Sequence, residues 1–331
     1  MDNRKIFVYF ACFHDSEVIP TIIDLYKKAT LPQNITVGID FQWMREDIKD
    51  DFVDWVSKNP QYNIRYTLTE YTMGNFWNII GLAKGRKRAY ELREDEAFAL
   101  LIDGHSMFGW HWDTKCITKY LKAEEITDKP ILHGYAGYYV LDKNRNRLFL
   151  DGYRSHIRYQ YYVNYDENDP YQKEAKFKWH ERLPTFIITK ENPDTNELIP
   201  NVKFSGNFSF TRYDICKHLP NWVLFEDEEI PWSINLFDAG YSFVFPSFNE
   251  PVVAHLYMGA TDPWFPARET RDNIEFYIED MPAFLKMKDD NIERYLDDEA
   301  NQSKIAKYEK YARVHILNGE TEEYYVPKDF H

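Results

Sequence analysis

The sequence predicts an α/β protein with a doubly wound, mostly parallel sheet and a helical C-terminal extension. Strand-like apolar runs alternate with amphipathic helical segments through the first third of the chain, the pattern of a sheet with crossover helices. The run from Phe98 to Ile102 is apolar throughout, so it is expected to be a strand buried on both faces. It ends in Asp103, Gly104 and His105, and ligands bind beyond the carboxyl ends of such strands. A binding site is therefore expected at this end of the sheet.

Before this central strand, expected strands and helices alternate along the chain, as a doubly wound sheet requires. Pro20 suits the first turn of a helix, because its φ is already helical and its missing N–H is not needed there. Pro32 and Pro60 follow the ends of two helices. In order, we expect a strand at 6–12, a helix at 21–29, a strand at 35–39, a short helix at 51–58, a strand at 63–70 and a basic helix at 81–93.

After the central strand, the chain is expected to add further strands and then acidic helices. The turn at 142–146 joins two strand-like runs and predicts a hairpin. We expect a helix at 114–123, hairpin strands at 132–141 and 147–153, strands at 186–188, 208–210 and 243–245, and helices at 273–288 and 291–312. This predicts one domain over 1–260 and a helical extension over 261–331, with an aromatic and basic insertion at 153–200 as a candidate acceptor region.

The amino-acid composition limits the classes of protein to which this chain can belong. The 331 residues are 44% hydrophobic and 17% aromatic, enough to bury a core, and the net charge of −14 gives no general basic surface for nucleic acid. Cys12, Cys116 and Cys216 are widely spaced, so they predict no disulfide framework or metal site and favour a reducing compartment. No segment resembles a signal peptide or a membrane span. The expected location is cytoplasmic, or the host cytoplasm if the chain is phage-encoded.

Asp103 and His105 form a candidate metal site. Two residues apart on an extended backbone, their side chains leave on the same side. A carboxylate oxygen with an imidazole nitrogen suits a divalent ion such as Mn²⁺. Gly104 leaves room for a ligand near the backbone. The alternative interpretation is a turn with a capping aspartate and a surface histidine.

Three later segments carry further candidate residues. Gly206 stands where a ligand could approach the backbone, and His255 follows two β-branched residues. Four acids at 226–229 lie next to an apolar run. The alternatives are a solvated acidic loop and a buried structural histidine.

Together these segments resemble a known family in their order along residues 5–258. The sequence is similar to the GlcNAc-transferase-like glycosyltransferases, which include the cytoplasmic enzyme that modifies hydroxyproline on Skp1 and are distantly related to the polypeptide GalNAc-transferases. The matching pieces are Phe7 to Asp15, Thr21 to Ala29, Pro32, Val37 to Gln42, Arg86, Leu101 to His105, Trp112-Asp113, Gly206, Phe225 to Ile230, Gly240-Tyr241, Pro246, Val252 to His255, and Tyr257. The resemblance implies a GT-A fold and an enzyme of the glycosyltransferase class.

The resemblance also implies roles for individual residues. Asp103, His105 and His255 would bind Mn²⁺ or Mg²⁺, and the ion would hold the diphosphate of a nucleotide-sugar donor, with UDP favoured. Residues at the donor would be Ala11, Phe13 and Asp15 at the base and ribose, Arg86 at the diphosphate, and Asp103 and Gly206 nearby. Glu228, Glu229 and Asp227 match the acids near the sugar and acceptor, and the family implies retention at the anomeric carbon.

The sequence departs from the family pattern where the sugar and acceptor would be read. His14 replaces an arginine, Gly104 replaces a serine, and Asn235 and Phe237 replace an arginine and a tryptophan. The candidate metal ligands are all present. We therefore expect this chain to catalyse the glycosyl transfer typical of the family. The sequence does not determine which sugar it transfers or which acceptor it modifies.

Three functions remain open from the sequence. The first is a metal-dependent glycosyltransferase that modifies a protein hydroxyl. The second is the same chemistry on hydroxymethylated DNA, as in phage enzymes that glycosylate 5-hydroxymethylcytosine, with the tyrosines and basic residues of 153–179 stacking on bases. The third is a non-catalytic sugar-binding protein, against which the intact set of Asp103, His105 and His255 argues.

Overall fold

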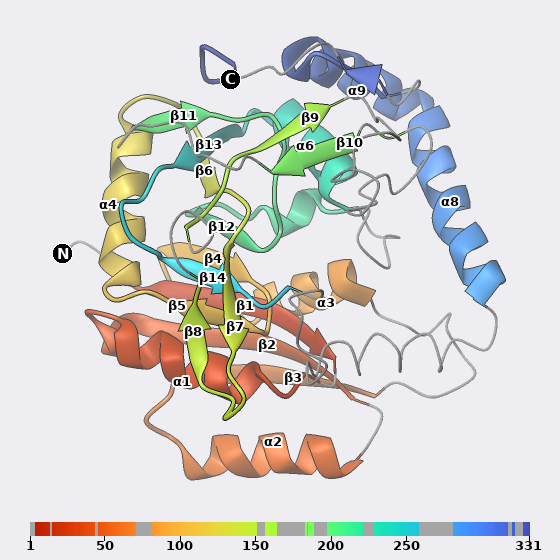
Figure 1. Cartoon of the computed structure of the whole chain (residues 1–331). Coiled ribbons are helices and arrows are strands. Elements are labelled where there is room, and N and C mark those ends of the chain that lie inside the picture. The colour runs from red at the N-terminus through yellow and green to blue at the C-terminus, as the bar shows by residue number, and fades with distance from the viewer. Residues whose placement is uncertain are drawn as a thin grey trace.

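The structure is a computed structural model of the whole chain. It describes residues 4–13, 15–43, 46–70, 81–150, 156–163, 183, 185–188, 197–220, 228–257, 281–316, 320–321 and 327–331. The predicted α/β class is confirmed by an eight-stranded sheet with helices on both faces (Figure 1).

The large sheet has the strand order β11-β13-β6-β12-β4-β1-β2-β3. Its four parallel pairs are β1–β2, β2–β3, β1–β4 and β6–β13, whereas β12 runs antiparallel to both β4 and β6 and β11 antiparallel to β13. The strands are β1 (Ile6–Phe13), β2 (Ile35–Trp43), β3 (Ile64–Glu70), β4 (Phe98–Ile102), β6 (Pro130–His133), β11 (Leu198–Pro200), β12 (Phe208–Thr211) and β13 (Ser242–Pro246). The sheet is thus mostly parallel, as predicted.

The alternation of side chains along β1 divides the core into two layers. Ile6, Val8 and Phe10 pack with α1, α2 and α4, whereas Phe7 and Tyr9 pack with α3, α6 and α9 on the opposite face. The helices are α1 (Val18–Lys28), α2 (Glu46–Lys58), α3 (Gly81–Tyr90), α4 (Trp112–Glu124), α6 (Glu229–Asp238), α8 (Met281–Asp297) and α9 (Glu299–Ala312). The predicted double winding is therefore present.

A second sheet, in the order β5-β14-β7-β8, lies beside the large one (Figure 1). Its strands are β5 (Ser106–Phe108), β14 (Val253–His255), β7 (Gly137–Leu141) and β8 (Arg147–Phe149). The expected hairpin strand over 132–141 was wrong in its extent. The segment divides between β6 in the large sheet and β7 in the small one, and only β7 pairs with β8.

The C-terminal part is helical as expected, but the break between its two helices lies at Asp298 and not at 289–290 as the sequence analysis predicted. Asp298 is extended and its side chain accepts the backbone N–H of Ala300 at 2.8 Å, so it caps α9 and separates it from α8. The side chains of Ile305 and Tyr308 share a core with those of α6. The predicted domain boundary near 260 lies outside the described residues, as does most of 153–200, from which the structure describes β9 (Gln160–Val163) and β10 (Thr185–Ile188). The remaining short elements are β15 (Val314–His315), β16 (Glu320–Thr321) and the 3₁₀ turns η1 (Pro32–Asn34) and η4 (Cys216–His218).

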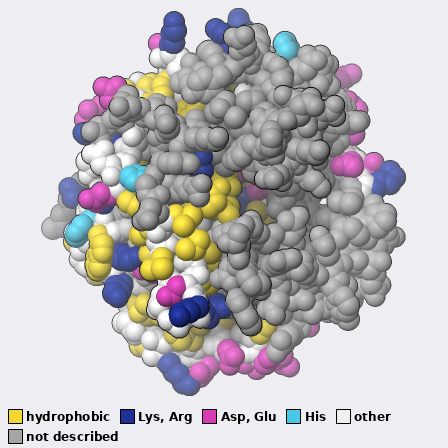
Figure 2. All heavy atoms as spheres, viewed as in Figure 1, with side chains coloured by type: hydrophobic (Ala, Val, Ile, Leu, Met, Phe, Trp, Pro, Cys, Tyr) yellow, Lys and Arg dark blue, Asp and Glu magenta, His cyan; other side chains and the backbone are white. Residues whose placement is uncertain are grey.

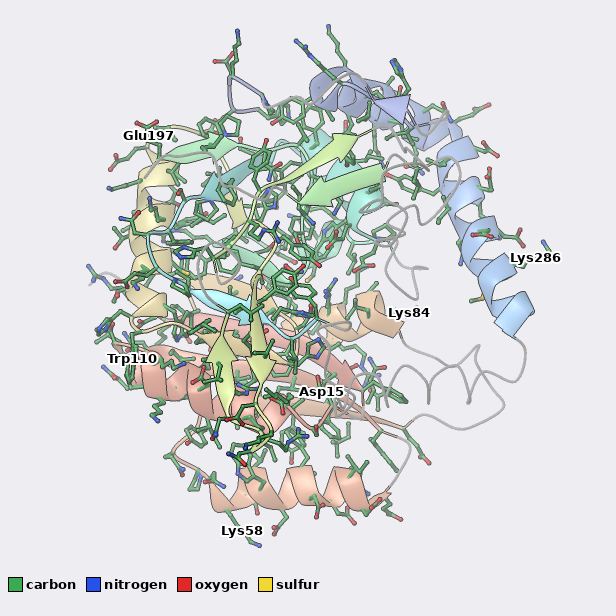
Figure 3. The ribbon with its side chains drawn as sticks, in the orientation of Figure 1. Asp15, Lys58, Lys84, Trp110, Glu197 and Lys286 are labelled. Carbon is green, nitrogen blue, oxygen red and sulfur yellow. The ribbon has the colours of Figure 1, made fainter. Side chains whose placement is uncertain are left out.

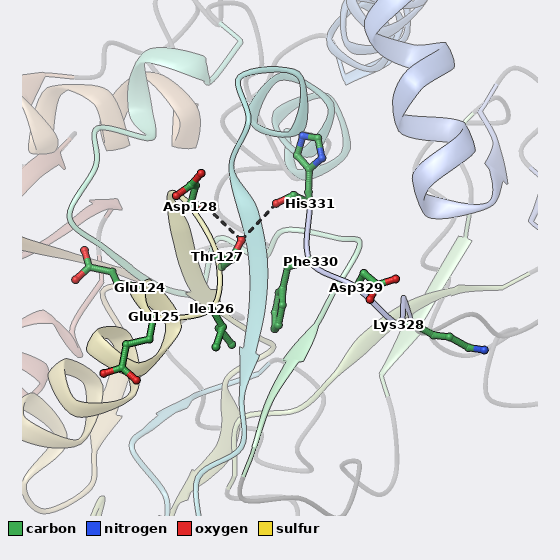
Figure 4. Close-up of a pocket in the computed structure, with 9 residues that line it drawn as sticks. All are labelled: Glu124, Glu125, Ile126, Thr127, Asp128, Lys328, Asp329, Phe330 and His331. Carbon is green, nitrogen blue, oxygen red and sulfur yellow. Dashed lines mark hydrogen bonds between the residues drawn. The ribbon is translucent and has the colours of Figure 1, made fainter.

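The last described residues pack against the loop after α4. The His331 ring stacks on Phe237 with centroids 3.9 Å apart, and its backbone C=O accepts from Ser242. The same C=O accepts from Thr127 (Figure 4). The shallow pocket in this region carries acidic side chains such as Glu124 and contains none of the candidate site residues. Of the helices in the described part, none is long and apolar enough to cross a membrane.

His133 should make the stability of the fold sensitive to acid. Its ring is fully buried against Phe204 and Phe243, and burial, with the charge of Lys203, lowers its pKa from 6.5 to about 3. Between these two values the unfolded chain binds a proton that the folded chain does not. This contribution to stability is therefore complete above pH 6.5 and is lost as the pH falls, at up to about 1.4 kcal/mol per pH unit.

Urea unfolding at pH 7 and pH 5 measures this effect. The variant His133→Phe should show a smaller drop in unfolding free energy between the two pH values than the wild type. His315→Gln, which changes an exposed histidine on β15, is the matched control and should leave the drop unchanged. Equal drops in the wild type and His133→Phe would contradict the assignment.

Candidate active site

The predicted metal ligands meet at the carboxyl end of β4. Asp103 and His105 follow this strand directly, and β14 places His255 opposite Ser106 in an antiparallel pair with β5. Ligand atoms of Asp103, His105 and His255 all lie within 4.8 Å of one another. One carboxylate oxygen and two imidazole nitrogens can bind a divalent ion, so these residues fit the ion that the resemblance implies.

Each histidine of this group has a carboxylate partner. His255 Nε2 lies 3.1 Å from Asp103 Oδ2, and His105 Nδ1 lies 2.6 Å from Asp15 Oδ2. A carboxylate on one ring nitrogen fixes the orientation of an imidazole and directs the other nitrogen to a metal. Asp15, expected at the nucleotide, is thus placed to orient His105. It lies between the end of β1 and the first turn of α1 (Figure 3).

The carboxylates here are held in the charged form. Burial raises the pKa of Asp103, but the hydrogen bond from His255 and the charge of Arg86 outweigh burial and bring the pKa well below its usual range. For Asp15, burial is likewise outweighed by the charge and hydrogen bond of His105, so its pKa is lowered. Charged carboxylates are the form that binds a cation.

Arg86 links α3 to the other side of Asp103. Its guanidinium contacts Asp103 Oδ1 at 3.1 Å, Glu228 Oε1 at 2.5 Å and the carbonyl oxygen of Gly206 at 3.2 Å. A Cβ on Gly206 would lie 2.5 Å from Arg86 Nη1, so a side chain there would displace the guanidinium from its present position. The close approach expected for a ligand at Gly206 is made here by Arg86.

Two adjacent acids at the start of α6 have different surroundings. Glu228 is 2% exposed, and its Oε2 has no hydrogen-bond partner among the described residues. Burial raises the pKa of Glu228 against the opposing charge of Arg86. Both carboxylate oxygens of Glu229 are engaged, by the N–H of Gly206 and by Lys203. The third predicted acid, Asp227, lies outside the described residues.

The expected nucleotide residues Ala11 and Phe13 lie at the end of β1, on the same rim as Asp103 because β1 and β4 are parallel. Beside Ala11, the sequence analysis missed Asp40 of β2. This buried carboxylate accepts from Thr67 at 2.8 Å and from Thr69 at 2.9 Å. The sequence feature that could have identified Asp40 is an acidic residue within an otherwise apolar strand.

A cluster of aromatic side chains was also missed. The rings of Tyr135 and Tyr257 stack with centroids 4.7 Å apart, Tyr138 packs on Tyr257 at 4.4 Å, and Tyr257 lies 4.1 Å from the His255 ring. The side-chain amide of Asn207 donates a hydrogen bond to the hydroxyl of Tyr257, with Nδ2 and the hydroxyl oxygen 3.1 Å apart. Apolar side chains gather on this face around β7 and β14 (Figure 2). The candidate metal ligands therefore have charged groups on one side and aromatic rings on the other.

Comparison with known proteins gives one family. The model described as Glycosyltransferase (GlcNAc) matches residues 80–313, which include Arg86, Asp103, His105, Glu228 and His255. No curated protein matches the chain in sequence.

The chain is also similar to solved structures at low identity. GalNAc-T7, crystallised with UDP, GalNAc and Mn²⁺, shares 13% identity at a TM-score of 0.45, over 76% of this chain and 44% of that one. The mannosyltransferase PcManGT from Pyrobaculum calidifontis, in complex with GDP-Man and Mn²⁺, shares 10% at 0.44, over 92% and 73%. S. aureus TarS shares 11% at 0.43, over 92% and 42%. This chain thus spans less than half the length of the GalNAc-T7 and TarS chains.

Proposed function

The chain belongs to the Glycosyltransferase (GlcNAc) family, and on this basis we propose that it transfers a sugar from a nucleotide-sugar donor to a hydroxyl of a macromolecular acceptor. One observation carries the proposal: Asp103, His105 and His255 converge within 4.8 Å of one another at the carboxyl end of β4. Such an end is where ligands bind in open α/β sheets.

The donor diphosphate lies between the ligand group and Arg86. Asp103, His105 and His255 would hold Mn²⁺ or Mg²⁺, which when bound supplies a Lewis acid at the departing nucleoside diphosphate. The buried guanidinium of Arg86 supplies a positive charge beside Asp103 that favours the phosphate oxygens, and its Nε–H has no partner among the described residues. Its contacts with Asp103 and Glu228 aim the guanidinium at this place.

The sugar and the nucleoside occupy opposite ends of this site. Glu228 Oε2, which is buried and has no described hydrogen-bond partner, accepts from a sugar hydroxyl. Ala11 and Phe13, at the end of β1, contact the base and ribose, with UDP as the favoured nucleotide. Transfer with retention at the anomeric carbon is proposed from the family resemblance.

The acceptor is proposed to be a protein hydroxyl. The net charge of −14 works against a phosphate backbone, because binding to DNA rests on neutralising phosphates with basic side chains. Salt-dependent binding to hydroxymethylated duplex DNA would overturn this choice and support the DNA-modifying alternative. The predicted cytoplasmic location stays a prediction.

Release of nucleotide from a donor panel tests the proposal. The protein is incubated with UDP-, GDP- and CMP-linked sugars, with Mn²⁺ or with EDTA, and free nucleotide is measured. We expect release from one UDP-sugar with Mn²⁺, and at least about a tenfold loss with EDTA, because the leaving diphosphate is then left without its counter-ion. Release that EDTA does not affect would contradict the metal site.

If no donor is hydrolysed, calorimetric binding of the same donors separates two cases. Tight, metal-dependent binding without turnover would fit the sugar-binding alternative. Absence of both binding and turnover would overturn the proposed function.

A further inference from the structure

We propose that Glu229, whose carboxylate pairs with the buried Lys203, is a positioning residue: its hydrogen bond from the N–H of Gly206 fixes Gly206, and through Gly206 the guanidinium of Arg86. This inference rests on the proposed function, since it concerns the groups that face the donor. It assigns Glu229, which the sequence placed among the catalytic acids, a positioning role that differs from the role of Glu228.

The first step is that the Glu229 carboxylate is fully engaged by the protein. Its Oε1 accepts the backbone N–H of Gly206 at 2.8 Å, and its Oε2 pairs with Lys203 Nζ. The Lys203 side chain is completely buried and also donates to the carbonyl oxygen of Phe204 at 3.2 Å. An ammonium group buried to this degree requires a charged partner. The pair therefore ties Glu229 to the segment 203–206.

The second step is that this segment is joined to the first turn of α6. The N–H of Phe204 donates to Ser233 Oγ at 3.0 Å, and Ser233 Oγ donates to the carbonyl oxygen of Glu229 at 2.5 Å. The residue before this helix is Glu228, the acid that contacts Arg86. A displacement of the segment relative to α6 would therefore separate the groups that hold Arg86.

The third step is that Gly206 is held from both sides. Its N–H donates to Glu229, and its carbonyl oxygen accepts from Arg86 Nη2 at 3.2 Å. The same guanidinium contacts Asp103 at 3.1 Å. Loss of the Glu229 bond thus frees the backbone of Gly206, whose carbonyl oxygen contacts Arg86 beside a candidate metal ligand. A misplacement of about 1 Å near reacting groups can lower a rate about 100-fold.

The experiment compares two variants that both lack the ion pair. Removing one partner alone would leave a buried unpaired charge, so both variants carry Lys203→Met. In one, Glu229→Gln keeps an oxygen that can accept from the N–H of Gly206. In the other, Glu229→Leu removes that acceptor. In both variants the two substituted side chains are neutral and similar in volume. The variants therefore differ in the hydrogen bond to the N–H of Gly206.

Steady-state nucleotide release, thermal unfolding and Mn²⁺ binding are measured for both variants and the wild type. We expect kcat within about threefold of the wild type for the Gln variant and about 10- to 100-fold lower for the Leu variant, with KM for the donor changed less than kcat. Both variants should unfold cooperatively and bind Mn²⁺ like the wild type.

Two results would overturn the inference. Equal inactivity of two folded variants would show that the hydrogen bond to Gly206 does not sustain activity and that the charge of Glu229 or of Lys203 is itself required. Equal activity would show that the hydrogen bond to Gly206 does not position the site.

Amide hydrogen exchange of 203–207 separates this inference from the proposed function. If the wild type neither binds a donor nor releases nucleotide from one, the proposed function fails on that result. The hydrogen bond between Gly206 and Glu229 is then judged by exchange alone: faster exchange in the Leu variant than in the Gln variant supports its positioning role, and equal exchange overturns it.

Discussion

Replacing Asp103 with asparagine should lower the rate of nucleotide release about 1,000-fold, the scale seen when one electrostatic group is removed from an active site. Asp103 contacts His255 through one carboxylate oxygen and Arg86 through the other, so its charge serves both the candidate metal group and the diphosphate side. The measurement is release from the preferred donor, together with Mn²⁺ binding by calorimetry.

Three further variants, which should affect the candidate metal site to different extents, test the same prediction. His105→Ala should also abolish turnover, because it removes a proposed ligand. Asp15→Asn keeps all three proposed ligands but weakens the group that orients His105, so Mn²⁺ affinity should fall only about 10- to 100-fold. Asp54→Asn, on the exposed face of α2, is the control and should change neither quantity. Full turnover in Asp103→Asn would exclude the site.

Replacing Arg86 with methionine should lower the free energy of unfolding by about 3–5 kcal/mol, the usual penalty for leaving one member of a buried ion pair without its partner. The side chains of Arg86 and Glu228 are each 3% exposed, so water cannot replace the lost contact. Chemical denaturation measures the change. Nucleotide release should be lost as well, because the diphosphate loses its guanidinium.

The double variant Arg86→Met with Glu228→Gln separates stability from function. Removing both charges should recover most of the lost unfolding free energy, whereas nucleotide release should stay low. If the single and double variants are equally stable, the lost stability does not come from an unpaired Glu228. If the double variant releases nucleotide at the wild-type rate, neither residue acts on the donor.

The central strand and half of the site could be predicted from sequence because they are local. Five consecutive apolar residues fix β4, and the spacing of Asp103 and His105 puts both at its end. The contact with His255 depends on the pairing of β14 with β5, two short strands far apart in the chain. The local sequence marked His255 as a candidate residue, but only the resemblance to a family pointed to it as a metal ligand, since no local pattern specifies that pairing.

The roles of Glu228 and Glu229 show a second limit. Adjacent acids before an apolar run are equivalent in sequence, but the start of α6 turns them in different directions. One meets Arg86, and the other meets Gly206 and Lys203. Likewise, Gly134 and Gly137 interrupt the strand pattern at 132–141, but they do not specify that β6 and β7 belong to different sheets.

Because the candidate metal ligands come from both sheets, binding of a metal ion would affect the stability of the folded chain. Asp103 extends from the large sheet, whereas His255 arrives on β14 of the small one, so an ion bound by both would fasten two sheets together. A ligand that binds only the folded chain adds to its stability with the logarithm of the ligand concentration. The supply of metal would therefore set two populations at once, the fraction of molecules that are folded and the fraction ready to bind donor.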